Sequence, residues 1–457
     1  MIGLSIIFFS AIIILFTGIQ KPEKKSKNLT VFSLLVAALF SLFENLEVIN
    51  TQTLFAWVPS SMLDFNNFRL SMVALVLFLS AIIIGLMPSS EKKGSDLLGL
   101  TLFALCGGII MLGSNHLVML FLGIEILSIP LYVLAGSDKK NLFANEAAIK
   151  YFLMGAFSTA IFLLGCAFIY GGTGTLIFGE MQLKVGFAAH FGEFPILIKL
   201  GVILMSVGML FKISAVPFHF WSPDVYEGSP NRVTSFMAII VKICGFVAFA
   251  QLMSNFEPMH SWYIKWLIPI SGITILLGNI AGMVQKSVKR TLAYSSIAHA
   301  GYLILFLLIP YAENAQILFV YSLSYGLSTS VMFYLIDKYS TADNFDFTIF
   351  KGIFNSNKLD AMALILAVLS LAGIPATIGF TAKYVLFSKA FEYNQWAVVI
   401  GLVGSAISIV YYFKPFKYAF VNENLLTNRE SSLFTNILLV LAMLSIVVFG
   451  LIPGIIL

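Results

Sequence analysis

Charged residues are scarce in this sequence. Asp, Glu, Lys and Arg make up 11% of its 457 residues, against roughly 25% in an ordinary soluble domain. Hydrophobic residues make up 59%, so the composition excludes a soluble globular enzyme. A membrane-spanning helix uses ~20 mostly apolar residues, and about fourteen such helices leave no room for a domain that binds NAD, flavin or ATP. The few charges form no basic block, so we expect no nucleic-acid partner.

Cysteine is also rare. Cys106, Cys166 and Cys244 each lie inside an apolar run, and no two of them share a CxxC spacing. Because this pattern does not fit metal, iron–sulfur or disulfide roles, we expect these three side chains to be small buried hydrophobic groups. The sequence also contains no G-x-S-x-G or HExxH motif. We therefore expect neither a metal nor a redox cofactor in this chain, and the visible chemistry is movement of charge.

Long apolar runs, separated by short polar segments, dominate what is present. We interpret them as about fourteen membrane-spanning helices of an all-α polytopic membrane protein. The first run starts apolar at once and ends in KPEKKSK, so we interpret it as a span and not as a cleaved signal peptide. The predicted spans are residues 2–19, 29–43, 68–87, 97–112, 117–135, 148–170, 195–217, 233–253, 262–284, 291–309, 314–336, 359–380, 396–413 and 433–453.

The distribution of Lys and Arg predicts the orientation. Most of them fall in the odd-numbered loops, whereas the opposite side holds only Arg69, Lys184, Lys199, Lys265 and Lys389. Positive charge collects on the cytoplasmic side of membrane proteins. We therefore expect the odd-numbered loops to face the cytoplasm and the N-terminus to lie outside. The expected location is the plasma (inner) membrane of a bacterium.

Two spans contain a proline beside small residues. Span 7 reads LFKISAVPFHFWSP around Pro217, and span 12 reads LAGIPATIGFTAKY around Pro375. Proline removes a backbone donor and clashes with the preceding turn, so each helix is predicted to break there. Each break falls in the fourth helix of a run of five, which predicts two inverted five-helix repeats. The predicted segments are 1–96 (three N-terminal helices), 97–253 (first repeat), 254–414 (second repeat) and 415–457 (C-terminal helix).

We single out five ionisable residues inside or at the edge of these spans, because a charge at the bilayer centre costs ~2.5–3.5 kcal/mol. They are Glu125, Lys150, Lys212, Lys242 and Lys383. Burial disfavours the charged form of an amine, and a nearby carboxylate favours it, so such residues suit a proton relay. Our hypothesis is that Glu125 pairs with Lys212. Forming or breaking this pair would switch the lysine between holding and releasing a proton.

Lys242 and Lys383 would continue this path, with His219 and His299 as intermediate stations. Each histidine also fits a simpler role: His219 as a hydrogen-bonded loop residue, and His299 as a packing residue. A structural role is open for Lys150 as well, because it follows a glutamate by four residues, the spacing of an ordinary helical ion pair.

Several long segments are similar to one known family. FKISAVPFHFWSPDVYEGSPNRVTSFMAIIVK (211–242), TLAYSSIAHAGY (291–302) and AGIPATIGFTAKY (372–384) resemble signatures of the antiporter-like membrane subunits of respiratory complex I. LGIEILSIPLYVL (122–134) and EAAIKYFLMGAFSTAIFLLG (146–165) resemble two more. The segment PDVYEGSP is more similar to the N-type subunits of bacterial NADH–quinone oxidoreductase, counterparts of mitochondrial subunit 2, than to the L and M types.

The resemblance implies a subunit that translocates protons and is driven from a distance by quinone reduction. NAD, FMN, iron–sulfur clusters and quinone are then expected in partner subunits, and M-, K- and J-type membrane subunits are the expected neighbours. The positions that match the family's functional residues are Glu125, Lys150, Lys212, His219, Lys242 and Lys383.

Three alternatives stay open. An Mrp-type cation/proton antiporter subunit shares most of these motifs, and a membrane-bound hydrogenase subunit is a second possibility. The neighbouring genes would separate the antiporter from an oxidoreductase subunit. The third alternative is a structural membrane anchor that conducts nothing, and an assay of proton pumping after Lys242→Ala would distinguish it from a pump.

Overall fold

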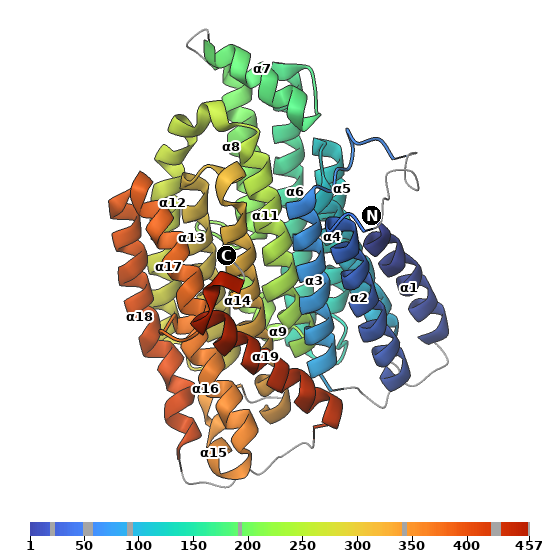
Figure 1. Ribbon diagram of the computed structural model, residues 1–457, viewed down its shortest axis with the longest axis vertical. Helices are drawn as coiled ribbons and strands as arrows, with labels where there is room; N and C mark the ends of the chain where they lie inside the picture. The colour runs from blue at the N-terminus through green and yellow to red at the C-terminus, as the bar shows by residue number, and fades with distance from the viewer. Residues whose placement is uncertain are drawn as a thin grey trace.

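The computed structural model describes residues 1–18, 23–48, 58–88, 95–190, 194–340, 345–421 and 431–455. Within these ranges the chain folds into helices and forms no β-strand beyond isolated bridges, which confirms the all-α fold. Most helices run side by side along the long axis of the molecule (Figure 1). The end of the first predicted span, residue 19, lies outside the described residues.

The first half of the chain forms helices that precede and surround the first break. They are α1 (Ile2–Gly18), α2 (Glu23–Asn45), α3 (Asn67–Leu86), α4 (Ser95–Gly113), α5 (Leu117–Ala135), α6 (Leu142–Thr173), α7 (Phe178–His190), α8 (Ile196–Lys212), α9 (Trp221–Gly228), α10 (Asn231–Phe236), the π-helix η1 (Met237–Val241) and α11 (Lys242–Ser254). The pattern of apolar runs predicts a loop where α7 lies; the structure forms a short helix there, at one end of the molecule (Figure 1).

The second half contains the second break. Its helices are η2 (Glu257–Met259), α12 (His260–Val284), α13 (Val288–Ile304), η3 (Leu305–Leu308), α14 (Tyr311–Tyr339), η4 (Phe347–Phe350), α15 (Ile353–Ser356), α16 (Lys358–Ala372), α17 (Ile378–Tyr393), α18 (Gln395–Ala419), α19 (Leu433–Leu451) and η5 (Pro453–Ile455). Here η2, η3, η4 and η5 are 3-10 helices. In Figure 1, α19 runs obliquely across the front of the bundle, and it contacts α14, α16, α17 and α3.

Each predicted span overlaps a helix of the structure. Eleven helices in the described ranges are long and apolar enough to cross a membrane, and Ile2–Phe16 is a shorter apolar helix. The helices on either side of the two breaks are too short to be counted among the eleven. The total of fourteen spans and the division into inverted repeats therefore stay predictions.

The first break follows α8. Ser214 adopts a left-handed backbone conformation (φ 61°). Trp221, at the start of α9, donates its indole N–H to the Phe211 carbonyl oxygen (3.1 Å), and the Val216 backbone N–H donates to the Thr274 hydroxyl of α12 (3.1 Å). Backbone groups released by the break thus find protein partners, which non-helical backbone at membrane depth requires.

The second break separates α16 from α17. Gly373 closes α16 in a left-handed conformation (φ 81°), and its backbone N–H donates to the Leu369 carbonyl oxygen (3.0 Å). A Cβ atom at this position would lie 2.9 Å from the Lys383 side chain. Glycine is therefore required here both by the backbone conformation and by the close passage of a lysine.

The core of the bundle is formed by the helices that carry most of the predicted relay. The segment Asn231–Ser254, α13 and α14 are buried along almost their whole length, whereas less than half of α5, α6, α18 and α19 is buried. Polar side chains on the central helices therefore face protein and not lipid.

Candidate functional site

Lys242 lies at the centre of the bundle, directly after the π-helix η1, an irregularity that is frequent at functional sites. Its side chain is buried, and its Nζ donates hydrogen bonds to the backbone carbonyl and the hydroxyl of Ser296 on α13. The Ser296 hydroxyl also accepts from Tyr325 Oη of α14 (3.0 Å). Among the described residues no carboxylate pairs with Lys242, and its amine donates to a hydroxyl and a carbonyl oxygen.

His299 lies one turn further along α13. Its Nδ1 is 2.7 Å from Tyr321 Oη, and its Nε2 is 3.3 Å from Tyr412 Oη. Tyr412 is hydrogen-bonded in turn to Ser295, and the Tyr325 ring centroid is 4.9 Å from that of the imidazole. Both ring nitrogens therefore have hydroxyl partners that can either donate or accept a proton.

Lys383 is buried at the second break. Its Nζ donates to the Leu371 (3.1 Å) and Ala372 (3.0 Å) carbonyl oxygens, the last of α16, where the helix dipole favours a positive charge. The amine also lies 5.1 Å from the centroid of the Tyr302 ring. A cavity of about 10 Å³ is lined by both Lys383 and His299, and this is about the room that one water molecule needs.

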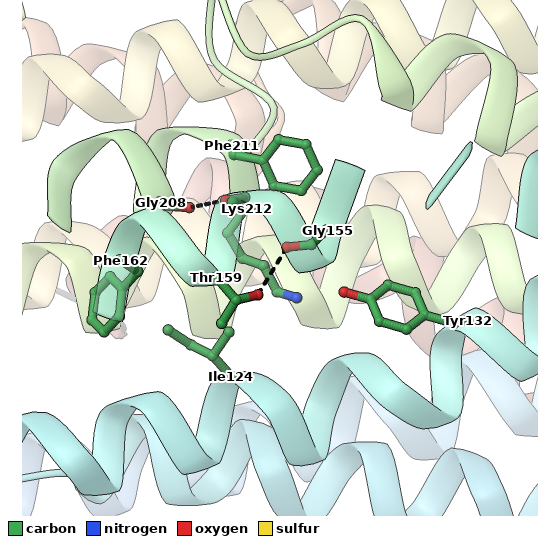
Figure 2. Close-up of a pocket in the computed structure, with 9 residues that line it drawn as sticks. Ile124, Tyr132, Gly155, Thr159, Phe162, Gly208, Phe211 and Lys212 are labelled. Atoms are coloured by element: carbon green, nitrogen blue, oxygen red, sulfur yellow. Dashed lines mark hydrogen bonds between the residues drawn. The ribbon is translucent and has the colours of Figure 1, made fainter. Parts of the chain in front are cut away.

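Lys212 lies at the end of α8, and its Nζ donates to the hydroxyl of Ser128 on α5. Figure 2 shows its side chain extending between α5 and α6 toward Thr159 and Tyr132, into a cavity of about 10 Å³. Glu125 lies one turn before Ser128 on α5 and is half-buried. No ion pair joins it to Lys212 among the described residues, although the two are close enough to interact electrostatically. The hypothesis that they pair stays a prediction.

Lys150 belongs to a charged cluster at the end of the bundle where α6 and α13 begin. It forms ion pairs with Glu146 (2.6 Å) and with Asp224 of α9 (2.8 Å). Arg290 pairs with Asp224 (3.0 Å) and Glu227 (3.0 Å). Burial raises the pKa of Asp224, but the hydrogen bonds from Lys150 and Arg290 outweigh it and hold that pKa below its ordinary value.

This charged cluster lines a cavity of about 450 Å³. It lies among loops that the Lys and Arg distribution assigns to the cytoplasmic side. The residues that line it are Asn141, Phe143, Glu146, Ala147, Lys150, Asp224, Glu227, Gly228, Arg290 and Phe345.

The structure brings Lys242, His299 and Lys383 into one hydroxyl-rich region, whereas Lys212 and Lys150 occupy separate places. His219 is buried beyond the first break, and in the described part of the chain no hydrogen bond or ion pair joins its side chain to any of these five residues. Its Nδ1 has no hydrogen-bond partner there.

The sequence suggests that Ser, Thr and Tyr hydroxyls bridge the relay, but it does not identify the individual hydroxyls that join these groups. Ser128, Ser295, Ser296, Tyr321, Tyr325 and Tyr412 all bind a predicted relay residue or its partner. The signal available was their presence in otherwise apolar runs, as in the YSS segment at 294–296 and the YYF segment at 411–413.

Sequence reasoning also placed Lys338 and Lys289 in loops. The structure buries both within helices, Lys338 in an ion pair with Asp360 (2.5 Å) and Lys289 against backbone carbonyls. Asp360, the fully buried partner of Lys338, was not singled out as a charge inside the bundle.

Comparison with known proteins adds to this geometry. Residues 114–408 match the model of the family described as NADH:quinone oxidoreductase/Mrp antiporter, transmembrane. The chain is 38% identical over 405 residues to the NADH-quinone oxidoreductase subunit N of Cytophaga hutchinsonii, covering 87% of each sequence.

Solved structures show the same relationship. A chain of respiratory complex I from Thermus thermophilus is 32% identical, with a TM-score of 0.84 over 99% of this chain and 98% of that one. A chain of the Mrp complex from Dietzia is 17% identical, with a TM-score of 0.77 over 100% of this chain and 96% of that one. The second likeness is one of fold alone.

Proposed function

Because the chain belongs to the family of NADH-quinone oxidoreductase subunit N, we propose that it is a membrane subunit of such a complex and translocates protons across a bacterial plasma membrane. The family and the apolar helices make it a multi-pass membrane protein. Its N-terminus lies outside in this proposal, following the distribution of Lys and Arg.

One observation carries the proposal. A continuous set of ionisable and hydroxyl groups on the central helices connects Lys242 through Ser296 and Tyr325 to the cavity shared by His299 and Lys383. Each member either binds a proton or has a hydroxyl that both donates and accepts. Reorienting such hydroxyls passes a proton between two amines that never touch. A purely structural bundle has no need of buried amines without carboxylate partners, which are costly in a low dielectric.

The first half of the chain supplies the switch in this proposal. Lys212 donates to the Ser128 hydroxyl, and its amine lies close enough to Glu125 to interact with it electrostatically. Its aliphatic stem lies beside Gly245, three residues after Lys242, because a Cβ on that glycine would be 3.5 Å from Lys212 Cγ. Movement of the Lys212 amine toward or away from Glu125 therefore changes the charge next to the central relay.

Partner subunits complete the activity. The family assignment supports an enzyme that oxidises NADH with quinone and moves protons as a translocase. In this proposal the redox groups (NAD, FMN, iron–sulfur clusters and quinone) are held elsewhere in the complex. Groups of three or more His, Cys, Asp or Glu side chains suited to a metal do not occur among the described residues, and the described cysteines are single and buried. M-, K- and J-type subunits are the proposed neighbours within the membrane.

The test is proton uptake into inverted membrane vesicles that carry the assembled complex, energised by NADH. Lys242→Ala is expected to lower proton uptake, because it removes the amine at the centre of the hydroxyl chain. A Lys265→Ala variant serves as the matched control, since that lysine lies outside this region and is not buried. Full proton uptake in an assembled Lys242→Ala complex would refute the proposal and favour the structural anchor.

An Mrp-type antiporter subunit and a hydrogenase subunit remain the alternatives from the same superfamily. The likeness to the Mrp chain is one of fold, at 17% identity, whereas the likeness to the complex I chain reaches 32%. This difference favours the oxidoreductase. NADH-driven quinone reduction by the purified complex that contains this chain separates the three.

A further inference from the structure

A buried lysine, Lys289, lies behind the charged cavity at the end of the bundle and is not part of the proposed relay. Lys289, on the first turn of α13, is 1% exposed. Its Nζ donates to the carbonyl oxygens of Glu227 (3.0 Å) and Ser229 (2.7 Å), at the end of α9. It also lies 4.5 Å from the centroid of the Phe345 ring. Since Glu227 and Phe345 both line the cavity, the Lys289 amine lies directly behind the cavity wall.

No carboxylate pairs with Lys289 in the part of the chain that the structure describes. The acidic side chains that interact with Lys289 electrostatically are Glu227 and Asp337; Arg290 pairs with the first, and Asn231 donates a hydrogen bond to the second. A buried amine held only by carbonyl oxygens keeps the cost of its charge largely uncompensated. Lys242 and Lys383 likewise have no carboxylate partner among the described residues, and this distinguishes all three from Lys338, which has the Asp360 carboxylate as a partner.

Polar groups continue from Lys289 toward the centre. Ser229 accepts through its carbonyl oxygen from both Lys289 (2.7 Å) and the Thr234 hydroxyl (3.3 Å). The Ser229 hydroxyl itself is buried and has no hydrogen-bond partner among the described residues. Thr234 also donates to the Tyr226 carbonyl oxygen (3.1 Å).

The side chain of Tyr226 reaches the group that binds the central lysine. It interacts with Ser296, the serine to which Lys242 donates. Lys289 and Ser296 also lie two turns apart on one face of α13, about 10 Å along the helix axis. The carbonyls and hydroxyls of the α9 to α10 segment fill this interval.

We propose that Lys289 is the proton-binding group through which protons pass from the charged cavity to Lys242. The ion pairs of Lys150, Asp224 and Arg290 hold the mouth of the cavity open and charged. Lys289 takes up a proton from water in the cavity and passes it toward Ser296 by way of the hydroxyls of Ser229, Thr234 and Tyr226, with water molecules carrying the proton between these hydroxyls, because the carbonyl oxygens of the segment only accept hydrogen bonds. This inference rests on the proposed function, because it assigns the access site of the same relay.

The experiment compares two arginine variants in the assembled complex. Arginine keeps the positive charge and the hydrogen bonds but does not release its proton at physiological pH. Lys289→Arg is therefore expected to lower NADH-driven proton uptake in inverted vesicles to the level of Lys242→Ala. Lys338→Arg is the matched control, because Lys338 is equally buried near the same end and keeps its ion pair with Asp360; it is expected to pump as the unmodified complex does.

The outcomes separate this inference from the proposed function. If Lys242→Ala lowers proton uptake and Lys289→Arg does not, Lys289 is a structural anchor and only the access site is refuted. If neither variant lowers proton uptake, the relay itself is refuted.

An Asn141→Cys variant tests access to the cavity. A charged thiol reagent added to inverted vesicles is expected to modify the new cysteine, whereas protection from the reagent on that side would contradict a cytoplasmic opening.

Discussion

The buried ion pair between Lys338 and Asp360 offers the sharpest test of how this bundle tolerates charge. Lys338 Nζ lies 2.5 Å from Asp360 Oδ2, and the two side chains are 4% and 0% exposed. Tyr339 donates its hydroxyl to the same oxygen (2.6 Å). Replacing Asp360 by alanine removes the carboxylate that pairs with the buried Lys338 ammonium.

The expected loss is large. Removing one partner of a buried ion pair typically costs about 3–5 kcal/mol, because the remaining charge stays buried without compensation. The double variant Lys338→Met with Asp360→Leu removes both charges. It should recover most of this loss and leave about 1–3 kcal/mol for the Tyr339 hydroxyl, which then has no acceptor. The order of stability is thus the unmodified protein, then the double variant, then Asp360→Ala.

The assay is heating of detergent-solubilised membranes that contain a fluorescently tagged chain, followed by size-exclusion chromatography of what remains monodisperse. The midpoint temperature is expected to fall most for Asp360→Ala and to rise again in the double variant. A double variant as unstable as Asp360→Ala would refute the reasoning, because the isolated charge would then not be the source of the loss. Proton uptake per NADH in the surviving Asp360→Ala complex should stay unchanged, since this pair contacts no relay residue.

Three other predictions concern the site and the second break. Ser128→Ala removes the hydroxyl that binds Lys212 and should lower proton uptake in inverted vesicles without preventing assembly; unchanged uptake would contradict a role for this contact. The cationic partners of Asp224 hold its pKa below the ordinary 3.8. The stability that these ion pairs contribute is therefore fully present above pH 3.8 and is lost only as the pH falls through the lowered pKa. The pH profile of proton uptake between about 5 and 8 should therefore be the same in Asp224→Asn as in the unmodified complex, apart from a uniform scaling, and a profile shifted along the pH axis would argue against it. Gly379→Ala places a Cβ 1.7 Å from a backbone oxygen of α16 and should cost about 1–3 kcal/mol of stability or more by overpacking. This loss should be seen as less assembled complex on native gels. Gly179→Ala, with open space around it, is the control and should assemble normally.

The positions of the helices and of their breaks could be predicted from the sequence, because both are local properties. An apolar run of sufficient length forms a helix in a bilayer whatever its neighbours are. A proline interrupts a helix through its own ring and its missing N–H. The burial of Lys212, Lys242 and Lys383 followed from the same reasoning, since each lies well inside an apolar run.

The partners of those lysines could not be predicted in this way. Lys212 binds Ser128, 84 residues away, rather than the neighbouring Glu125, and Lys242 binds Ser296, 54 residues away. A shift of one residue in helix rotation turns a side chain by about 100°, so contacts between helices depend on packing that no local pattern contains.

The sequence by itself therefore determined an all-helical membrane bundle with two broken helices and amines in its interior. Only the tertiary structure decided which oxygens receive those amines, and that Lys289 and Lys338 are buried while Lys150 lies at a charged, open edge. The physical reason is that the hydrophobicity of each residue, which decides whether a segment enters the membrane, can be read along the chain. A hydrogen bond, in contrast, depends on the distance and angle between groups from different helices, and these are set only when the helices pack together.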